Sequence, residues 1–193
     1  MKKLNLGLWL AVAITALLAG CVKYEPVRPP NIRVNPYPKT EHRAVLHVND
    51  QLEAGLIVTA EVIYEMENRS PCVPLDQGRS LGGSRPMFGK TITVPINRID
   101  DHTYEVRYYN DYLMDEDYYG LGKCHWTGHP ILNVNHAGVD YIVTNNAKKT
   151  RGQSEEKICV PGTSTQGACA APEYARAKDA EGAFHITLTS YKD

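Results

Sequence analysis

The feature that most constrains the fold is a regular alternation of apolar and polar residues between Leu56 and Met66. The apolar positions are Leu56, Val58, Ala60, Val62, Tyr64 and Met66, whereas Thr59, Glu61 and Glu65 lie between them. Successive side chains of a β-strand point to opposite faces of the sheet, so this period of two predicts a strand with one packed and one solvated face. That pattern is typical of antiparallel sheets.

Several further stretches read as short strands, and no helical pattern alternates with them. They are residues 44–48, 91–96, 103–109, 131–135, 139–144, 158–160 and 184–191, with Phe184, Ile186 and Leu188 facing inward in the last. The segment Asn135–Gly138 predicts a hairpin turn, and Pro95 indicates an edge or the end of a strand. One short helix is expected at Ala171–Ala180, with Pro172 near its first turn. The sequence therefore predicts an all-β fold over residues 41–193, an antiparallel β-sandwich of which the immunoglobulin-like arrangement is one form.

The N-terminus carries a bacterial lipoprotein signal. Lys2 and Lys3 give it a positive start, Leu4–Leu18 is mostly apolar, and Leu18-Ala19-Gly20-Cys21 matches the lipobox that a lipoprotein peptidase cuts before the cysteine. The apolar run is too short for a membrane-spanning helix. We therefore predict that residues 1–20 are removed and that Cys21 is lipidated, with ~0.8 kcal/mol of membrane affinity per buried CH₂. Val22, in place of aspartate, favours an outer-membrane lipoprotein that faces the periplasm.

Residues 21–40 are predicted to form a lipid-anchored, proline-rich tether. The prolines at positions 26, 29, 30, 36 and 38 exclude a helix or a central strand, because each fixes φ and removes a hydrogen-bond donor. An extended spacer of this kind spans ~3.1 Å per residue. Removal of the signal changes the formal charge from −1 to −3, because Lys2 and Lys3 leave with it. The mature chain therefore has no basic excess that would favour nucleic acid as a partner.

Four cysteines remain after Cys21, namely Cys72, Cys124, Cys159 and Cys169. An even number in an oxidising periplasm predicts two disulfides, for which three pairings exist. We favour Cys159–Cys169, which closes a loop rich in glycine, serine and threonine, together with Cys72–Cys124, which joins distant segments. Loop closure gives each disulfide ~2–4 kcal/mol of stability. The competing interpretation is a metal site of Cys124, His125 and His129, but the paired-ligand spacing of zinc sites is missing.

An acidic, tyrosine-rich segment follows the predicted strand at 103–109 and is the candidate partner-binding surface. Its residues are Asp111, Tyr112, Asp115, Glu116, Asp117, Tyr118 and Tyr119. Tyrosine offers rigid apolar contact area with a hydroxyl group, and carboxylates steer a basic partner. The alternative is that the tyrosines fill the core while the acids keep the loop soluble. Because Tyr118 and Tyr119 are adjacent, a strand would leave at least one of them exposed.

The sequence lacks the motifs of the common enzyme classes, since it contains no GxSxG, HExxH, P-loop or GxGxxG. The acidic run at 115–117 also lacks the spacing of a calcium-binding loop. We therefore expect a binding protein with no catalytic residues, no metal and no cofactor.

Four blocks of the chain carry a family resemblance, namely the lipobox at Leu18–Cys21, AVLHVNDQLEAG at 44–55, YEMENRSPCVPLD at 64–76 and YLMDEDYYGLGKCHW at 112–126. Together they resemble the immunity lipoproteins of type VI secretion phospholipase effectors. The resemblance covers most of the mature chain. It implies a lipid-anchored periplasmic protein that binds a toxic secreted lipase and covers its active-site entrance or holds its lid. The contact residues of that family vary between pairs, so the resemblance assigns none here.

Two other functions remain open. In the first, the protein inhibits a different periplasmic hydrolase, such as a lysozyme or an amidase. In the second, it is a structural lipoprotein of an envelope assembly. A neighbouring gene for a lipase or for a wall-cutting enzyme would separate the two inhibitor functions. Co-purified envelope components would indicate the structural role.

Overall fold

A computed structural model gives the structure of residues 25–49, 52, 55–78, 82–144, 152–162, 165–175 and 179–192. The predicted signal at 1–20 and the predicted lipidation site Cys21 lie outside these residues. The chain forms two compact units, of which the larger comprises Pro29–Pro74 and Met87–Asp193. The smaller comprises Met1–Arg28 and Leu75–Pro86, and its described part contains an antiparallel bridge between Asp76 and Ser84.

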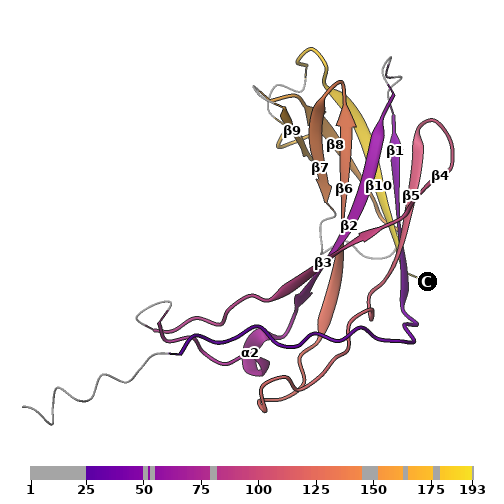
Figure 1. Ribbon diagram of the computed structural model, residues 1–193. Coiled ribbons are helices and arrows are strands. Elements are labelled where there is room, and N and C mark those ends of the chain that lie inside the picture. Colours follow the sequence, from indigo (N-terminus) through magenta and orange to yellow (C-terminus); the bar gives the residue numbers. More distant parts are fainter. Residues whose placement is uncertain are drawn as a thin grey trace, which may run out of the picture. The chain divides into compact units, whose positions relative to one another are not determined.

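The larger unit contains a ten-stranded sheet (Figure 1). Its strands are β1 (Glu41–Val48), β2 (Ile57–Met66), β3 (Gly89–Val94), β4 (Ile96–Arg98), β5 (Thr103–Tyr109), β6 (Trp126–His136), β7 (Val139–Thr144), β8 (Ser154–Val160), β9 (Gln166–Ala170) and β10 (Phe184–Lys192). They are ordered β3-β2-β6-β7-β9-β8-β10-β1-β5-β4. All neighbours are antiparallel except β7 and β9, which run parallel. A four-residue helix, α2 (Arg69–Cys72), follows β2.

Residues 89–98 join the two edges of this sheet and bring it close to a closed barrel. β3 pairs with β2 as far as Val94, Pro95 interrupts the strand, and β4 then pairs with β5 from Ile96 onward. Proline has no N–H to donate to a ladder, which explains why the change of partner falls at this residue. The predicted all-β, mainly antiparallel architecture is confirmed, and the two layers expected of a sandwich belong to one curled sheet.

The apolar interior is built from the inward faces of most strands. Its buried members are Ala44, Leu46, Val48, Ala60, Tyr104, Val106, Leu132, Val134, Tyr141, Val143, Cys159, Phe184, Ile186 and Leu188. The alternation in β2 is as predicted, since every second residue from Ala60 to Met66 is buried. Tyr141 of β7 lies opposite Gly167 of β9, and its ring occupies the space that a Cβ at position 167 would need.

Both favoured disulfides are present in the larger unit. Cys72–Cys124 links the segment after β2 to the segment before β6, and Cys159–Cys169 links directly opposed residues of β8 and β9. Two structural disulfides point to an oxidising compartment outside the cytoplasm.

Local structure differs from prediction at several places. The described residues of 171–180 form turns in place of the expected helix, and the short helix lies at Arg69–Cys72, inside a stretch that reads as loop. The strand predicted at 158–160 begins at Ser154, and Gln166–Ala170 is a strand that the sequence pattern did not indicate. The Cys159–Cys169 disulfide explains why Gln166–Ala170 forms a strand, because it holds β9 against β8.

An ion pair inside the curled sheet was not expected from the sequence. Lys157 and Glu155 lie opposite Ile186 and Leu188 of β10, which belong to the core, and directly opposed residues share a face of a sheet. The Lys157 Nζ is 2.9 Å from a carboxylate oxygen of Glu155, and the side chains are only 9% and 12% exposed. Two charges in such a site are tolerated because they neutralise each other.

Within the described residues, no helix has both the length and the apolar character needed to span a membrane.

We predict that Lys157→Met lowers the free energy of unfolding by about 3 kcal/mol, because it leaves the Glu155 carboxylate poorly hydrated and without its lysine partner. Urea denaturation measures the change. The double variant Glu155→Leu/Lys157→Met removes both charges and is expected to recover most of the loss. A double variant as unstable as the single one would contradict the assignment of a buried, mutually dependent pair.

Candidate partner-binding surface

The predicted partner-binding residues lie in the connection between β5 and β6, residues 110–125, which we call the β5–β6 loop. This loop and helix α2 lie at the same end of the sheet, opposite the β6–β7 turn (Figure 1). The Cys72–Cys124 disulfide joins them. The position of the loop is therefore fixed in part by a covalent bond to α2.

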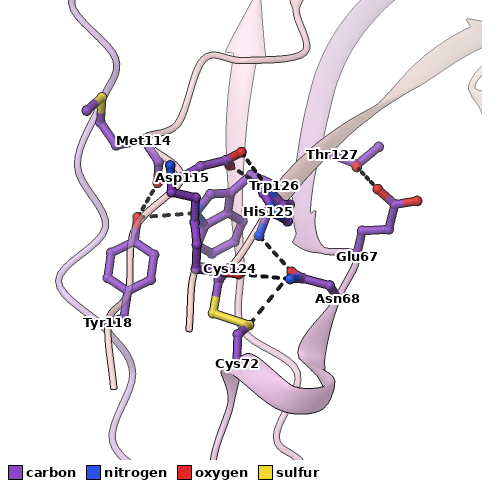
Figure 2. Close-up of polar contacts among 11 residues, drawn as sticks. Glu67, Asn68, Cys72, Met114, Asp115, Tyr118, Cys124, His125, Trp126 and Thr127 are labelled. Carbon is purple, nitrogen blue, oxygen red and sulfur yellow. Dashed lines mark hydrogen bonds and ion pairs between the residues drawn. A yellow bond between two sulfur atoms is a disulfide. The ribbon is translucent and has the colours of Figure 1, made fainter. Parts of the chain in front are cut away.

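Asn68 fastens the β5–β6 loop to the end of β2 (Figure 2). Its Oδ1 accepts a hydrogen bond of 2.7 Å from the His125 N–H, and its Nδ2 donates one of 2.9 Å to the Lys123 carbonyl. The Glu67 N–H donates to the His125 carbonyl at 2.9 Å. Three hydrogen bonds and a disulfide thus hold the same short stretch, which restricts its backbone strongly.

Asp115 acts as an acceptor within the loop. One carboxylate oxygen accepts the Trp126 N–H at 2.9 Å, and the other lies 2.8 Å from the His125 Nδ1 (Figure 2). The Asp115 side chain is 40% exposed, so a partner has access to it despite these contacts.

Tyr118 is turned towards the protein. Its hydroxyl donates to the Met114 carbonyl and accepts a hydrogen bond of 3.2 Å from the Trp126 indole N–H, while the two rings meet edge to face at 6.2 Å (Figure 2). Burial raises the pKa of the Tyr118 hydroxyl, which therefore stays protonated and able to donate at neutral pH.

The other two tyrosines of the predicted surface stack on aromatic neighbours. The Tyr119 ring lies 6.4 Å from that of Phe88, and burial raises its pKa to about 12. The Tyr112 ring lies 5.7 Å from that of Tyr64, whose hydroxyl donates to the Tyr109 carbonyl at 2.7 Å. Each tyrosine therefore has a packing role inside the molecule.

Residues 33–40, which we call the strap, bind along the β5–β6 loop. Val34 bridges to Leu113, with hydrogen bonds of 2.8 Å from the Asn35 N–H to the Tyr112 carbonyl and of 2.9 Å from the Met114 N–H to the Arg33 carbonyl. This part of the predicted tether differs from a free spacer, because its backbone donors and acceptors are paired with the domain.

Two predicted surface carboxylates hold the strap in place. Asp111 accepts hydrogen bonds from the Lys39 N–H at 2.9 Å and from the Thr40 N–H at 2.9 Å. Glu116 forms an ion pair with Arg33, and this hydrogen-bonded partner raises the pKa of the guanidinium group. Both acids therefore already bind groups of the same chain.

The structure brings the seven predicted residues into one loop but leaves only Asp115 and Asp117 exposed. The other five are partly buried, and each has a neighbour described above. The rival metal site loses its thiolate, because Cys124 is bonded to Cys72. Among the residues that the structure describes, no group of three or more His, Cys, Asp or Glu side chains is arranged to hold a metal ion.

The exposed apolar residue of this loop was missed by the sequence reasoning. Leu121 is 47% exposed and lies between Gly120 and Gly122, both of which have positive φ. The signal was present as Gly-Leu-Gly in the sequence, a small apolar motif between two flexible residues. The strap had no comparable signal, because its proline content resembles that of any linker.

Comparison with protein-family profiles, curated proteins and solved structures finds no match for this chain.

We predict that Asp111→Ala loosens the strap, because the Lys39 and Thr40 N–H groups lose their carboxylate acceptor. Loss of hydrogen bonds to a charged group favours local opening by ~1.5 kcal/mol, which corresponds to about tenfold faster amide exchange at these two residues. Hydrogen–deuterium exchange measures it. The matched control is Asp101→Ala, which removes a carboxylate that is 86% exposed and pairs with Arg98. Equal exchange in both variants would show that Asp111 does not hold the strap.

Proposed function

We propose that this chain is a lipid-anchored periplasmic immunity protein that binds and inhibits a type VI secreted phospholipase effector. Its effect is to protect the membrane of the cell that makes it. The observation that carries the proposal is the lipobox at Leu18–Cys21, in a chain that also has two disulfides and three further blocks resembling immunity lipoproteins.

The proposed location suits this function. A lipid anchor at Cys21 holds the domain on the outer membrane, where it faces the periplasm and meets an effector before membrane phospholipids are cleaved. Disulfides suit an oxidising compartment of this kind. Attachment to one surface also raises the effective concentration of the inhibitor for an enzyme that works on a membrane.

Inhibition is proposed to occur by occupation of a surface, without chemistry by the inhibitor itself. A tight inhibitor buries roughly 800 Å² on each partner, and a few anchoring residues dominate the affinity. The β5–β6 loop supports this mode, because its backbone is held by Asn68 and by the Cys72–Cys124 disulfide. A surface that is already ordered loses little conformational entropy when it binds.

The exposed carboxylates Asp115 and Asp117 retain the role of steering a basic partner. Asp115 and Asp117 each accept a backbone N–H, from Trp126 and Leu121 respectively, and still reach solvent. The three tyrosines and Asp111 and Glu116 act beneath this surface and position it. Direct contact with the partner is therefore assigned to the exposed acids and to their neighbours in the loop.

The proposal predicts that the full-length protein rescues cells that export a type VI phospholipase effector into their own periplasm. Viability and release of free fatty acids measure protection, and the lipidated protein purified in mild detergent is expected to inhibit the enzyme near equimolar ratio. Cells that export a lysozyme or an amidase toxin form the control. Protection against the lysozyme or amidase toxin alone would show that the protein inhibits a wall-cutting enzyme in place of a phospholipase. Protection against none of these toxins would contradict both inhibitor functions.

We further predict that Asp115→Asn/Asp117→Asn slows association with the phospholipase about threefold to tenfold at low salt, because the steering charge is lost while an amide oxygen still accepts each backbone N–H. The difference should shrink in high salt, where surface charges are screened. Stopped-flow or surface-based kinetics measure the rate constants, with Asp101→Asn as the matched control. Association rates that match those of the wild type at low salt would exclude these two acids from recognition.

A further inference from the structure

The segment Glu116–Cys124, which we call the tip loop, is a closed loop within the β5–β6 loop. The Cys124 N–H donates a hydrogen bond of 2.9 Å to the Glu116 carbonyl, so the two ends of the loop are joined directly. A compact surface loop whose ends meet in this way is held as a unit, and such loops are frequently functional.

The tip loop is fixed at both ends by groups outside it. At the first end, the Glu116 carboxylate pairs with Arg33 of the strap. At the second, the Lys123 carbonyl accepts the Asn68 amide, and Cys124 is covalently bonded to Cys72. The loop therefore cannot swing without breaking contacts to two other segments of the chain.

The aromatic side chains of the tip loop point towards the protein, whereas its one aliphatic side chain does not. Tyr118 contacts Trp126 and Tyr119 stacks on Phe88, which anchors the first half of the loop. Leu121 in the second half is 47% exposed. A single exposed leucine is ordinary on a protein surface, so its setting has to be considered.

The backbone around Leu121 is arranged to present it. Gly120 has φ of +71° and Gly122 has φ of +114°, conformations that glycine adopts without strain, and a Cβ added at either would meet nothing within 4 Å. The Leu121 N–H donates to the Asp117 carboxylate at 2.9 Å, which fixes the turn. The result is a half-exposed apolar side chain on an ordered backbone, flanked by two glycines that add no side chain of their own.

We propose that the tip loop is the anchor of the inhibitory contact, and that Leu121 enters the apolar acyl-chain pocket of the phospholipase. This inference rests on the proposed function. An enzyme that binds fatty-acyl chains must have an apolar pocket open to its substrate, and a branched aliphatic side chain on a fixed loop is complementary to it. Pre-organisation lowers the entropic cost of insertion.

The charges around the tip loop favour a protein pocket over a lipid surface as the site that Leu121 enters. Asp117 is exposed on the tip loop, and Asp115 is exposed directly before it. Lys123 is the one exposed lysine or arginine of the tip loop, and the neighbouring Arg33 is already paired with Glu116. Insertion of Leu121 into a bilayer would bring these carboxylates to a surface that is itself often anionic, which costs free energy. A basic rim around an apolar pocket would instead attract them.

The test compares Leu121→Ala with Ile142→Ala in the full-length lipidated protein purified in mild detergent. Ile142 is an equally aliphatic, 57% exposed residue on β7, away from the loop, so the two variants lose similar apolar surface. Leu121→Ala is expected to weaken inhibition of the phospholipase at least tenfold, as for a central anchoring residue, while Ile142→Ala inhibits like the wild type. Inhibition by the wild type should also be competitive with long-chain phospholipid in mixed micelles. Thermal unfolding and circular dichroism establish that both variants are folded.

The outcomes separate the two proposals. If the wild type inhibits and Leu121→Ala inhibits equally well, or if inhibition is not competitive with long-chain substrate, the assignment of the tip loop is overturned while the proposed function stands. If the wild type inhibits no phospholipase, the proposed function fails and this inference fails with it. If Leu121→Ala weakens binding to phospholipid vesicles and leaves inhibition unchanged, Leu121 contacts the membrane and the proposed insertion into a protein pocket is wrong.

Discussion

The pairing of one continuous segment with both edges of the sheet is the constraint on which the rest of the larger unit depends. Residues 89–94 extend the ladder of β2, and residues 96–98 extend that of β5, with Pro95 between them. A sheet whose two ends are joined through one residue has to curl, and curling encloses the apolar faces of the strands. The same closure brings the starts of β1 and β6 and the ends of β2 and β5 to one end, where the connecting segments meet.

Polar contacts then convert that end into a rigid surface. Asn68 and the Cys72–Cys124 disulfide tie the last part of the β5–β6 loop to the segment after β2, and the strap pairs with the first part of the loop through the bridge between Val34 and Leu113. Most of the carboxylates here accept backbone N–H groups of the same chain. Such groups satisfy local donors first, and this explains why an acidic, tyrosine-rich sequence produces an ordered loop with little exposed aromatic surface.

Sequence reasoning captured what depends on periodicity and covalent chemistry. The alternation in β2 and β10 is as predicted, because a period of two is a local signal, and both favoured cysteine pairs are present. What escaped depended on tertiary contacts. The ion pair between Glu155 and Lys157 was not predicted, since the register with β10 places these two side chains on the inward face while Glu156 between them is exposed. The argument that Tyr118 or Tyr119 must be exposed assumed a strand, whereas a loop allows each to turn towards a different partner.

Under the proposed function, the rigidity of the β5–β6 loop affects the free-energy cost of binding a lipase. A lipase surface that opens and closes offers its apolar pocket in only some of its conformations, and a ligand pays for selecting one of them. An inhibitor whose own loop is already ordered loses little further conformational entropy when it binds that conformation of the lipase. The disulfide, the Asn68 hydrogen bonds and the strap hold the tip loop, while the Leu121 side chain is 47% exposed. That division of roles, with support beneath and a partly exposed apolar group above it, suits a binding element, because a contact residue is positioned best on a rigid and well-supported segment.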